Sequence, residues 1–279
     1  MRGFPTFLLF FTLLFFLTPL LCLSAGDFSA HEDSGGGEAY KLPQTVSRKG
    51  EDCSVADLIT GRLAAMGVKG FRPEARKAAA VAAATELAAL YAREGNADAY
   101  EILTPEEAKK SWGEAWFKTY WPELEEAVRE TWGQVLRLDG NLFSPSVFPL
   151  SWGQTTAGVE CPYDFTAEGF EAEIAVSAAK ARKVFPDYET SLTVKKARNG
   201  RVETVTSGST VLTGDETAKR FGLPSPSFSA RVEEGRLIFT CQGKGSGEGM
   251  SLYGANEWAK RGMDYEEILT RFYPDATLS

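Results

Sequence analysis

Histidine and cysteine, the side chains that most often hold zinc in proteins, are scarce in this chain of 279 residues. The single histidine, His31, lies in a polar, glycine-containing stretch, and we interpret it as a bystander. The cysteines are Cys22, Cys53, Cys161 and Cys241, and no two of them form a C-x-x-C pair. The usual zinc-binding patterns are therefore absent, and we expect neither a metal nor a cofactor.

Positive charge is also in deficit, with 30 Lys and Arg against 38 Asp and Glu, a net charge of −8 and a pI near 5.0. An acidic surface is repelled by phosphate backbones, so we expect no nucleic-acid partner. The hydrophobic share of 43% is ordinary for a globular protein. The part of the chain that follows the first 50 or so residues is long enough for one large domain or two packed ones.

Charge is missing altogether from Phe4 to Leu23, which read FPTFLLFFTLLFFLTPLLCL. An apolar run of this length can cross a bilayer and is longer than the core of most signal peptides. The sequence leaves open whether residues 1–25 are an uncleaved membrane anchor or a cleaved signal sequence. In the first case the domain is held at the cell membrane by a single N-terminal span, outside the cytoplasm; in the second it is secreted.

The apolar run is followed by a polar, aperiodic stretch, residues 26–52, which we interpret as a flexible tether. The folded domain is then predicted to cover residues 53–279. An exported domain meets an oxidising environment, in which disulfides persist. Whether two of its three cysteines pair, or all three stay reduced and buried, is not decided by their spacing.

Two long helical segments are predicted at the start of this domain. Residues 73–94 open with proline, which suits a first helical turn, and are rich in alanine. Residues 104–129 begin with a capping box, Thr104 with Glu107. This second segment carries aromatic residues at roughly helical spacing, which we expect in the core; the alternative is that an exposed subset stacks on sugar rings. These aromatic residues are Trp112, Trp116, Tyr120 and Trp121.

From residue 131 onward the pattern favours strands. Hairpin turns are predicted at Asp139-Gly140-Asn141, Asn199-Gly200 and Glu233-Glu234-Gly235. Residues 213–221 and 263–273 are predicted to form short helices. The predicted class is α+β, with N-terminal helices packed on mostly antiparallel strands, a glycine-rich loop and a short C-terminal helix.

The glycine-rich loop reads GKGSGEGMSLYGA over residues 243–255. It resembles the motif G-x-G-H-G-x-G-M-S-Q-Y-G-A of the stage II sporulation protein D (SpoIID) family. Further blocks resemble the family in the same order, so that the resemblance covers residues 53–279. These blocks are residues 73–85, 127–140, 222–228 and 265–274.

The resemblance implies a membrane-anchored lytic transglycosylase that cleaves peptidoglycan glycan strands during engulfment in sporulation. A glutamate acts as general acid and base, because a carboxyl group must protonate the glycosidic oxygen. Glycan strands are then the main partner, with other sporulation wall hydrolases or their membrane partners as a further class and the membrane reached through residues 4–23. The residues that the motif match assigns to substrate binding are Gly247, Gly249, Met250, Ser251, Tyr253 and Gly254.

The family acid is missing from its expected place. The family carries it in a G-E-M-P-like segment before the alanine-rich helix, and alignment of that segment puts Arg62 at the acid's position. Arginine cannot release a proton at usable pH. No acidic residue lies between Asp57 and Glu74. Glu248 and Glu74 are the remaining candidates for a relocated acid, and Glu248 is alternatively a salt-bridge partner for Arg62.

Other polar positions of the family are lost together with the acid. The glutamine and arginine of its long helix correspond to Ala79 and Ala84, and a histidine of its middle block corresponds to Phe148. In the glycine loop, Ser246 replaces histidine and Leu252 replaces glutamine. Removal of a buried carboxylate leaves its polar partners unpaired at a cost of about 1–3 kcal/mol each, which apolar replacements relieve.

Three functions remain open from the sequence. The first is an inactive relative that binds glycan strands or scaffolds wall enzymes. The second is an active transglycosylase with a relocated acid. The third is an exported protein whose ligand is unrelated to peptidoglycan.

Overall fold

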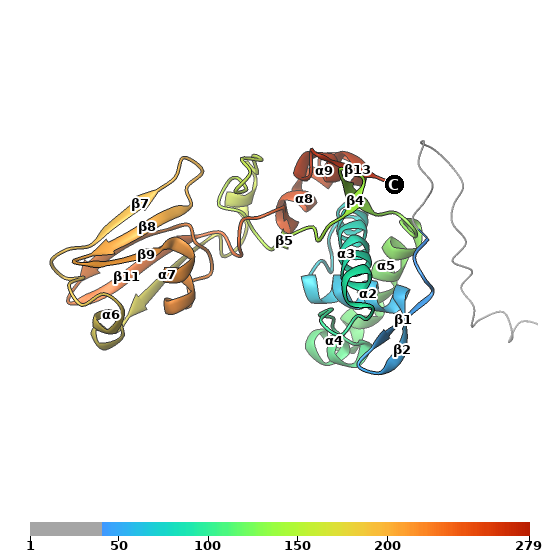
Figure 1. Ribbon diagram of the computed structural model, residues 1–279, viewed down its shortest axis with the longest axis horizontal. Coiled ribbons are helices and arrows are strands. Elements are labelled where there is room, and N and C mark those ends of the chain that lie inside the picture. The colour runs from blue at the N-terminus through green and yellow to red at the C-terminus, as the bar shows by residue number, and fades with distance from the viewer. Residues whose placement is uncertain (1–40) are drawn as a thin grey trace, which may run out of the picture. The chain divides into compact units, whose positions relative to one another are not determined.

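Helices dominate the first half of the folded chain and strands the second (Figure 1). The computed structural model describes residues 41–279. The first elements are β1 (Thr45–Arg48) and β2 (Glu51–Ser54), an antiparallel hairpin that leads into α2 (Val55–Met66). The predicted α+β class is confirmed.

The hairpin corrects the predicted end of the tether at residue 52. Val46 of β1 is only 3% exposed and pairs with Cys53 of β2. The carbonyl of Ser47 accepts a hydrogen bond of 2.8 Å from the amide of Ala97, which ties the hairpin to the domain. Within residues 41–279, the first strand therefore begins at Thr45, and the apolar side chain of Val46 is buried there.

The membrane segment predicted from the sequence is not part of the described structure. Within residues 41–279, no helix combines the length and the apolar character that a bilayer crossing requires. The apolar run Phe4–Leu23 lies outside the described residues, as do His31 and most of the predicted tether. The anchor or signal sequence therefore stays a prediction.

The alanine-rich helix α3 (Pro73–Glu94) has the bounds predicted for it, and Gly95 ends it in a left-handed conformation with φ of 70°. From Ala78 to Ala84 no side chain is more than 4% exposed. Alanine side chains are short, so several helices can pack closely on this one. They are α2, α5 (Glu114–Glu130), α8 (Leu252–Ala259) and α9 (Tyr265–Phe272).

The second predicted helical segment is divided in two by Gly113. Residues Pro105–Trp112 form α4, which starts with the predicted capping box, and α5 begins one residue later. Gly113 adopts φ of 86° and ψ of 155°, which a helix cannot accommodate. The expectation of buried aromatics is right for Trp121, which is 8% exposed, and wrong for Trp116, which is 56% exposed.

All three predicted hairpins are present, in several small sheets rather than one large one. One sheet has the order β13-β3-β4 and brings the C-terminal strand beside the first predicted hairpin. The second hairpin lies in the sheet β7-β8-β9, and the third in the sheet β10-β11-β6. The bounds are β3 (Leu136–Leu138), β4 (Asn141–Leu142), β6 (Glu171–Val176), β7 (Thr193–Lys196), β8 (Val202–Ser207), β9 (Thr210–Thr213), β10 (Phe228–Glu233), β11 (Arg236–Gln242) and β13 (Ala276–Leu278).

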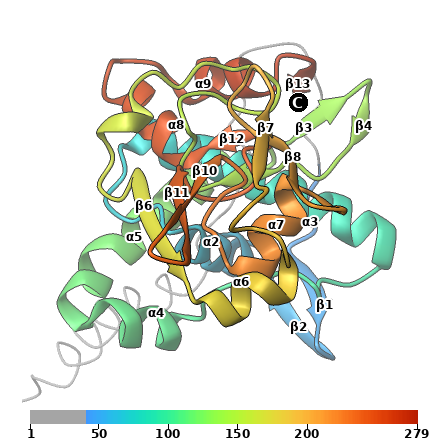
Figure 2. The ribbon, with the colours of Figure 1, turned by 90° about the vertical axis from the view of Figure 1, so that its left-hand side faces the viewer.

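The last two sheets enclose a core of their own with α6 (Ala178–Val184) and α7 (Gly214–Phe221) (Figure 2). α6 packs on β11, and α7 packs on β8 and β9. Aromatic rings fill this core, and their centroids lie between 5.0 and 5.9 Å apart. The rings belong to Phe185, Phe221, Phe228 and Phe239.

The helical part is joined to β3 by a buried hydroxyl. Thr85 of α3 is fully buried; its Oγ1 donates to the carbonyl of Val81 at 2.7 Å and accepts from the amide of Leu136 at 2.9 Å. We expect Thr85→Val to lower the free energy of unfolding by about 1–3 kcal/mol, because the valine keeps the shape and leaves the Leu136 amide without a partner. Urea denaturation measures this change.

Thr119→Val in α5 is the matched control, since Thr119 is exposed and its hydroxyl donates only to the carbonyl of Ala115. We expect a change within about 0.5 kcal/mol for it. Equal losses in the two variants would contradict the assignment of a stabilising role to the Thr85 bridge.

Candidate functional site

The glycine loop is built from backbone conformations that favour glycine. Its four alternating glycines have φ values of 71°, 103°, 79° and 74°. Side chains other than hydrogen are strained at such values. These glycines are Gly243, Gly245, Gly247 and Gly249.

The same glycines allow another segment, residues 146–152, to lie directly against the loop. A Cβ atom added to Gly249 would lie 1.9 Å from the carbonyl oxygen of Ser146, and one added to Gly247 would lie 2.1 Å from the ring of Trp152. At Gly243 and Gly245 the corresponding distances to the segment are 2.8 Å. The alternation of glycines is thus explained by packing within the protein, not by space left for a ligand.

Hydrogen bonds fix the two segments in register. Leu150 and Lys244 exchange amide–carbonyl bonds of 3.1 and 2.7 Å. Two short strands, β5 (Val147–Phe148) and β12 (Met250–Ser251), pair in parallel at the end of the loop. The loop therefore leads from β11 into α8 along a path that residues 146–152 define.

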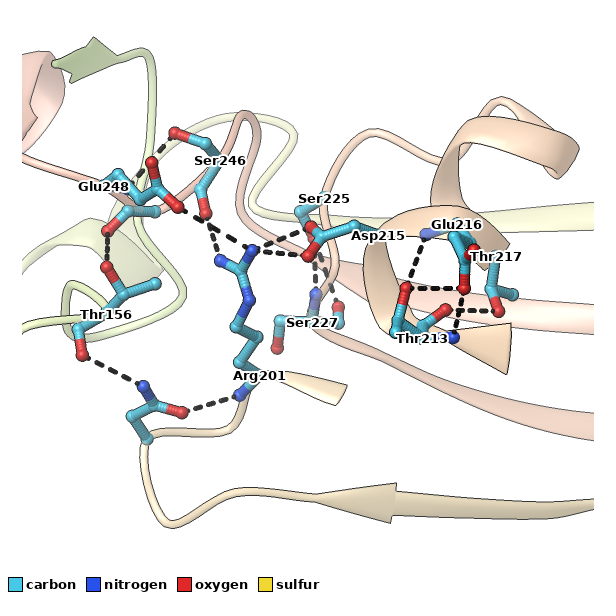
Figure 3. A network of polar contacts seen from close by, with 12 residues as sticks. Thr156, Arg201, Thr213, Asp215, Glu216, Thr217, Ser225, Ser227, Ser246 and Glu248 are labelled. Carbon is cyan, nitrogen blue, oxygen red and sulfur yellow. Dashed lines mark hydrogen bonds and ion pairs between the residues drawn. The ribbon is translucent and has the colours of Figure 1, made fainter. Parts of the chain in front are cut away.

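The tip of the loop is held by Arg201, which lies just before β8 (Figure 3). Its Nη1 donates to the carbonyl of Ser246 at 2.7 Å, and its Nη2 donates to both carboxylate oxygens of Asp215 at 2.8 and 2.7 Å. The amide of Thr156 donates to the carbonyl of Gly247 at 2.8 Å. Bonds from a charged guanidinium are among the strong ones, so the tip is held in one position.

The carboxylate of Asp164 organises the start of α8. Its Oδ2 accepts from the amide of Ser151 at 2.9 Å and from the hydroxyl of Ser251 at 2.7 Å. Ser251 in turn caps α8 by accepting from the amide of Gly254 at 3.1 Å. Asp164 is fully buried, and burial raises its pKa above the usual range while the serine hydrogen bonds act in the opposite direction.

The cysteines of the described residues are free thiols, and two of them are buried. Cys53, Cys161 and Cys241 form no disulfide, so the structure favours the reduced alternative. Burial raises the pKa of Cys161 to about 12 and that of Cys241 to about 11. Since the thiolate is the reactive form, both groups are inert at neutral pH.

Arg62, at the position assigned to the family acid, is held in an ion pair inside the helical part. Its Nε and Nη2 each donate to one carboxylate oxygen of Glu86 on α3, both at 2.9 Å. The suggested pairing of Arg62 with Glu248 is wrong. The Glu248 carboxylate lies 4.0 Å from Arg201 instead, with its side chain 59% exposed.

The other candidate acid, Glu74, is occupied by two partners. Its Oε1 lies 2.9 Å from Nζ of Lys77, and its Oε2 accepts from the amide of Tyr265 at 3.0 Å. Because Tyr265 is the first residue of α9, Glu74 connects the starts of α3 and α9. The structure therefore gives Arg62, Glu74 and Glu248 three separate sets of partners and does not assemble them into one site.

Most residues assigned to substrate binding are buried. Met250 and Ser251 are 0% exposed, and Gly247 and Gly254 are buried as well. Tyr253 is half-buried, and its hydroxyl lies 3.3 Å from Oγ1 of Thr166. Of the side chains in the loop, those open to solvent belong to Lys244, Ser246 and Glu248.

Asp164 and Arg201, which hold the loop in place, were not predicted from the sequence. The partners of Asp164 are 13 and 87 positions away in the chain, and Ser246 is 45 positions from Arg201. No local pattern marks such long-range bonds. As for metals, within residues 41–279 no three Cys, His, Asp or Glu side chains come close enough to hold an ion.

Comparison with known proteins finds similarity to one family. The family model described as Stage II sporulation protein (SpoIID) matches residues 47–138. Stage II sporulation protein D of Bacillus subtilis (strain 168) is 25% identical over 266 residues, which cover 85% of this chain and 77% of that protein. The protein of the same name from Bacillus amyloliquefaciens is 24% identical over 273 residues, with the same shares.

The chain is therefore similar to the SpoIID family at low identity, as the glycine motif indicated. The family model covers the chain from β2 through α2, α3, α4 and α5 to β3, and the two relatives extend the similarity over most of the chain.

The packing of the glycine loop can be tested at Gly249. We expect Gly249→Ala to lower the free energy of unfolding by more than about 3 kcal/mol, because the new Cβ meets the Ser146 carbonyl in addition to the strain of a positive φ. The control is Gly262→Ala, where φ is +93° and no atom lies within 4 Å of the added carbon. For it we expect about 1 kcal/mol, from conformational strain alone. The free energy of unfolding is measured by urea denaturation. If the two variants lowered it by similar amounts, close packing of the loop would be contradicted.

Asp164 predicts a pH dependence of stability with a definite sign. The folded chain keeps a proton on Asp164 at pH values where the unfolded chain has lost it, because burial raises the pKa of this carboxyl. The stabilisation that this raised pKa provides is fully present below the pKa that the carboxyl group has in the unfolded chain. It is lost as the pH rises through the pKa of the same group in the folded chain. We expect Asp164→Asn, which cannot titrate, to gain stability relative to the parent as pH rises from about 4 to 7. A difference that stays constant over this range would refute the raised pKa.

Proposed function

We propose that this chain is an exported, sporulation-related cell-wall protein that binds peptidoglycan glycan strands and has lost transglycosylase activity. The alternative within this role is that it scaffolds other wall enzymes or their membrane partners. The observation that carries the proposal is the Arg62–Glu86 pair: a bidentate ion pair occupies the position where the family alignment puts the acid.

The remaining carboxyl groups do not suit proton donation to a glycosidic oxygen. A general acid must reach the substrate and hold its proton until the transition state. Asp164 has the raised pKa but is fully buried, and Glu74 is engaged by Lys77 and the amide of Tyr265. Glu248 is exposed beside a guanidinium, as in a surface ion pair.

Retention of the loop supports a binding role. The four glycines, Asp164 and Arg201 keep the backbone of the loop in place. Family positions that are polar elsewhere are here Ala79, Ala84 and Leu252, and each is at most 4% exposed. We expect a protein to lose such polar side chains and to keep the backbone of the loop when it has lost catalysis and still binds its ligand. Residues 4–23 would hold the domain at the membrane, outside the cytoplasm.

A second candidate, an active enzyme with Glu248 as acid, is favoured by one observation. Glu248 is 59% exposed at the tip of the loop, so its carboxyl group can meet a bound strand without a change of fold.

Digestion of purified, stem-peptide-free glycan strands separates the two candidates. We expect no release of anhydro-sugar ends from the full-length chain, because Arg62 stands at the acid's aligned position and Glu74 is engaged by Lys77 and the amide of Tyr265. Release of such ends that disappears in Glu248→Gln would overturn the inactive assignment. An authentic lytic transglycosylase serves as the positive control.

Sedimentation with isolated sacculi tests the binding role itself. We expect the chain to sediment with sacculi that have been stripped of protein. Failure to sediment would remove the wall function altogether and leave an unrelated exported ligand as the alternative.

A further inference from the structure

An exposed tryptophan stands on α5, far along the chain from the glycine loop. Trp116 is 56% exposed, and its ring stacks on that of Tyr120 with an interplanar angle of 1° and a centroid distance of 5.4 Å. No hydrogen bond joins Trp116 Nε1 to any part of the chain that the structure describes. The indole of Trp121, by contrast, is buried and donates to Glu125 at 2.9 Å. Trp116 therefore offers both an open ring face and an unused donor.

One ring of the pair lies beside the loop between α2 and α3. Tyr120 lies over Gly70, where an added Cβ would be 3.4 Å from the Tyr120 hydroxyl, in ordinary van der Waals contact. Gly70 has φ of +74°, a conformation that strains any larger side chain. The platform of Trp116 on Tyr120 is thus pre-formed, which lowers the entropy cost of binding.

A polar cavity is lined by later residues on the same face of α5, Glu123 and Ala127. Residues three and four positions apart share a helix face, so Trp116, Tyr120, Glu123 and Ala127 form one column about 16 Å long. The cavity has a volume of about 240 Å³ and lies between this column and the first turn of α3. Its lining consists of Pro73, Arg76, Lys77, Glu123, Glu126, Ala127 and Glu130.

Arg76 connects the two ends of this surface. Its Nη1 donates to the carbonyl of Phe71 at 2.7 Å and to the carboxylate of Glu123 at 2.6 Å, which places the residues after Gly70 beside the column. Its side chain is 9% exposed, and its Nε is buried without a partner. A buried donor without a partner costs free energy unless a ligand or water satisfies it.

We infer that this α5 surface binds a strand of linked sugars, with one ring on Trp116 and its neighbours over the polar cavity. The exposed face of an indole carries negative charge density and attracts the C–H groups of a pyranose. Five of the seven residues around the cavity are charged, and they carry both signs. These charged groups pair with one another, as Arg76 does with Glu123 and Lys77 with Glu130, and Arg76 Nε is left without a partner. A neutral, hydroxyl-rich ligand can add hydrogen bonds to the paired groups, whereas an apolar helix or an acyl chain would remove them from water and offer no hydrogen bond in return.

The inference rests on the proposed glycan-binding function and adds a second contact surface to it.

The full-length chain, purified in a mild detergent, is titrated calorimetrically with N-acetylglucosamine hexamers and with stem-peptide-free glycan strands. We expect Trp116→Ala to weaken binding about tenfold through loss of stacking, and Trp116→Phe to recover part of it. Glu126→Ala, at a side chain that is 57% exposed, is expected to weaken binding about threefold without unfolding the chain.

Val211→Ala is the matched control, because Val211 is 58% exposed on β9 and lies on neither proposed surface. We expect its affinity to equal that of the parent chain. Equal binding by the parent and by Trp116→Ala would refute the α5 surface alone and leave the proposed function standing. Absence of binding by the parent chain to both ligands would refute the proposed function. Binding of isolated stem peptides that depends on Trp116 would show the occupant to be a peptide and overturn the inference.

Discussion

Close contact between two stretches of backbone is the constraint on which the rest of this structure depends. The glycine loop and residues 146–152 approach so closely that a single added carbon at Gly249 would overlap the Ser146 carbonyl. The loop carries the chain from β11 into α8, and α8 packs on α3. A change in this contact would therefore disturb the strand-rich part and the helical part together. Side-chain bonds from Asp164 and Arg201 reinforce a path that the glycines make possible.

In the helical part, small buried side chains and one ion pair occupy positions where the SpoIID family motif has polar residues. Ala79 and Ala84 are buried on α3, and Arg62 is tied to Glu86 of the same helix by two bonds of 2.9 Å. A paired guanidinium at a half-buried position stabilises the contact between α2 and α3 but moves no proton. Similarity to the SpoIID family agrees with the frame of the molecule, and within that frame Arg62 is held by Glu86.

Local signals predicted most of the fold correctly. Pro73 and Gly95 delimit α3, the capping box at Thr104 starts α4, and glycine-containing turns mark all three hairpins. These features depend on residues a few positions apart, so they can be read from the chain directly. The exposed ring of Trp116 could not be predicted in this way. Helical spacing places Trp116 near the buried face of α5. In the folded chain Tyr120 lies beside Gly70, whereas the ring of Trp116 stacks on Tyr120 and stays 56% exposed.

By itself the sequence determined the class, the hairpins, the glycine motif and the absence of an acid between Asp57 and Glu74. Only the tertiary structure decided what those residues do. Alternating glycines suggest a ligand loop until residues 146–152 are found against them, and Arg62 has no evident partner until α3 brings Glu86 to it. The physical reason is the same in both cases. Burial and hydrogen bonding depend on contacts between segments that are 24 to about 100 positions apart in the chain. A local sequence pattern cannot predict that such segments lie together.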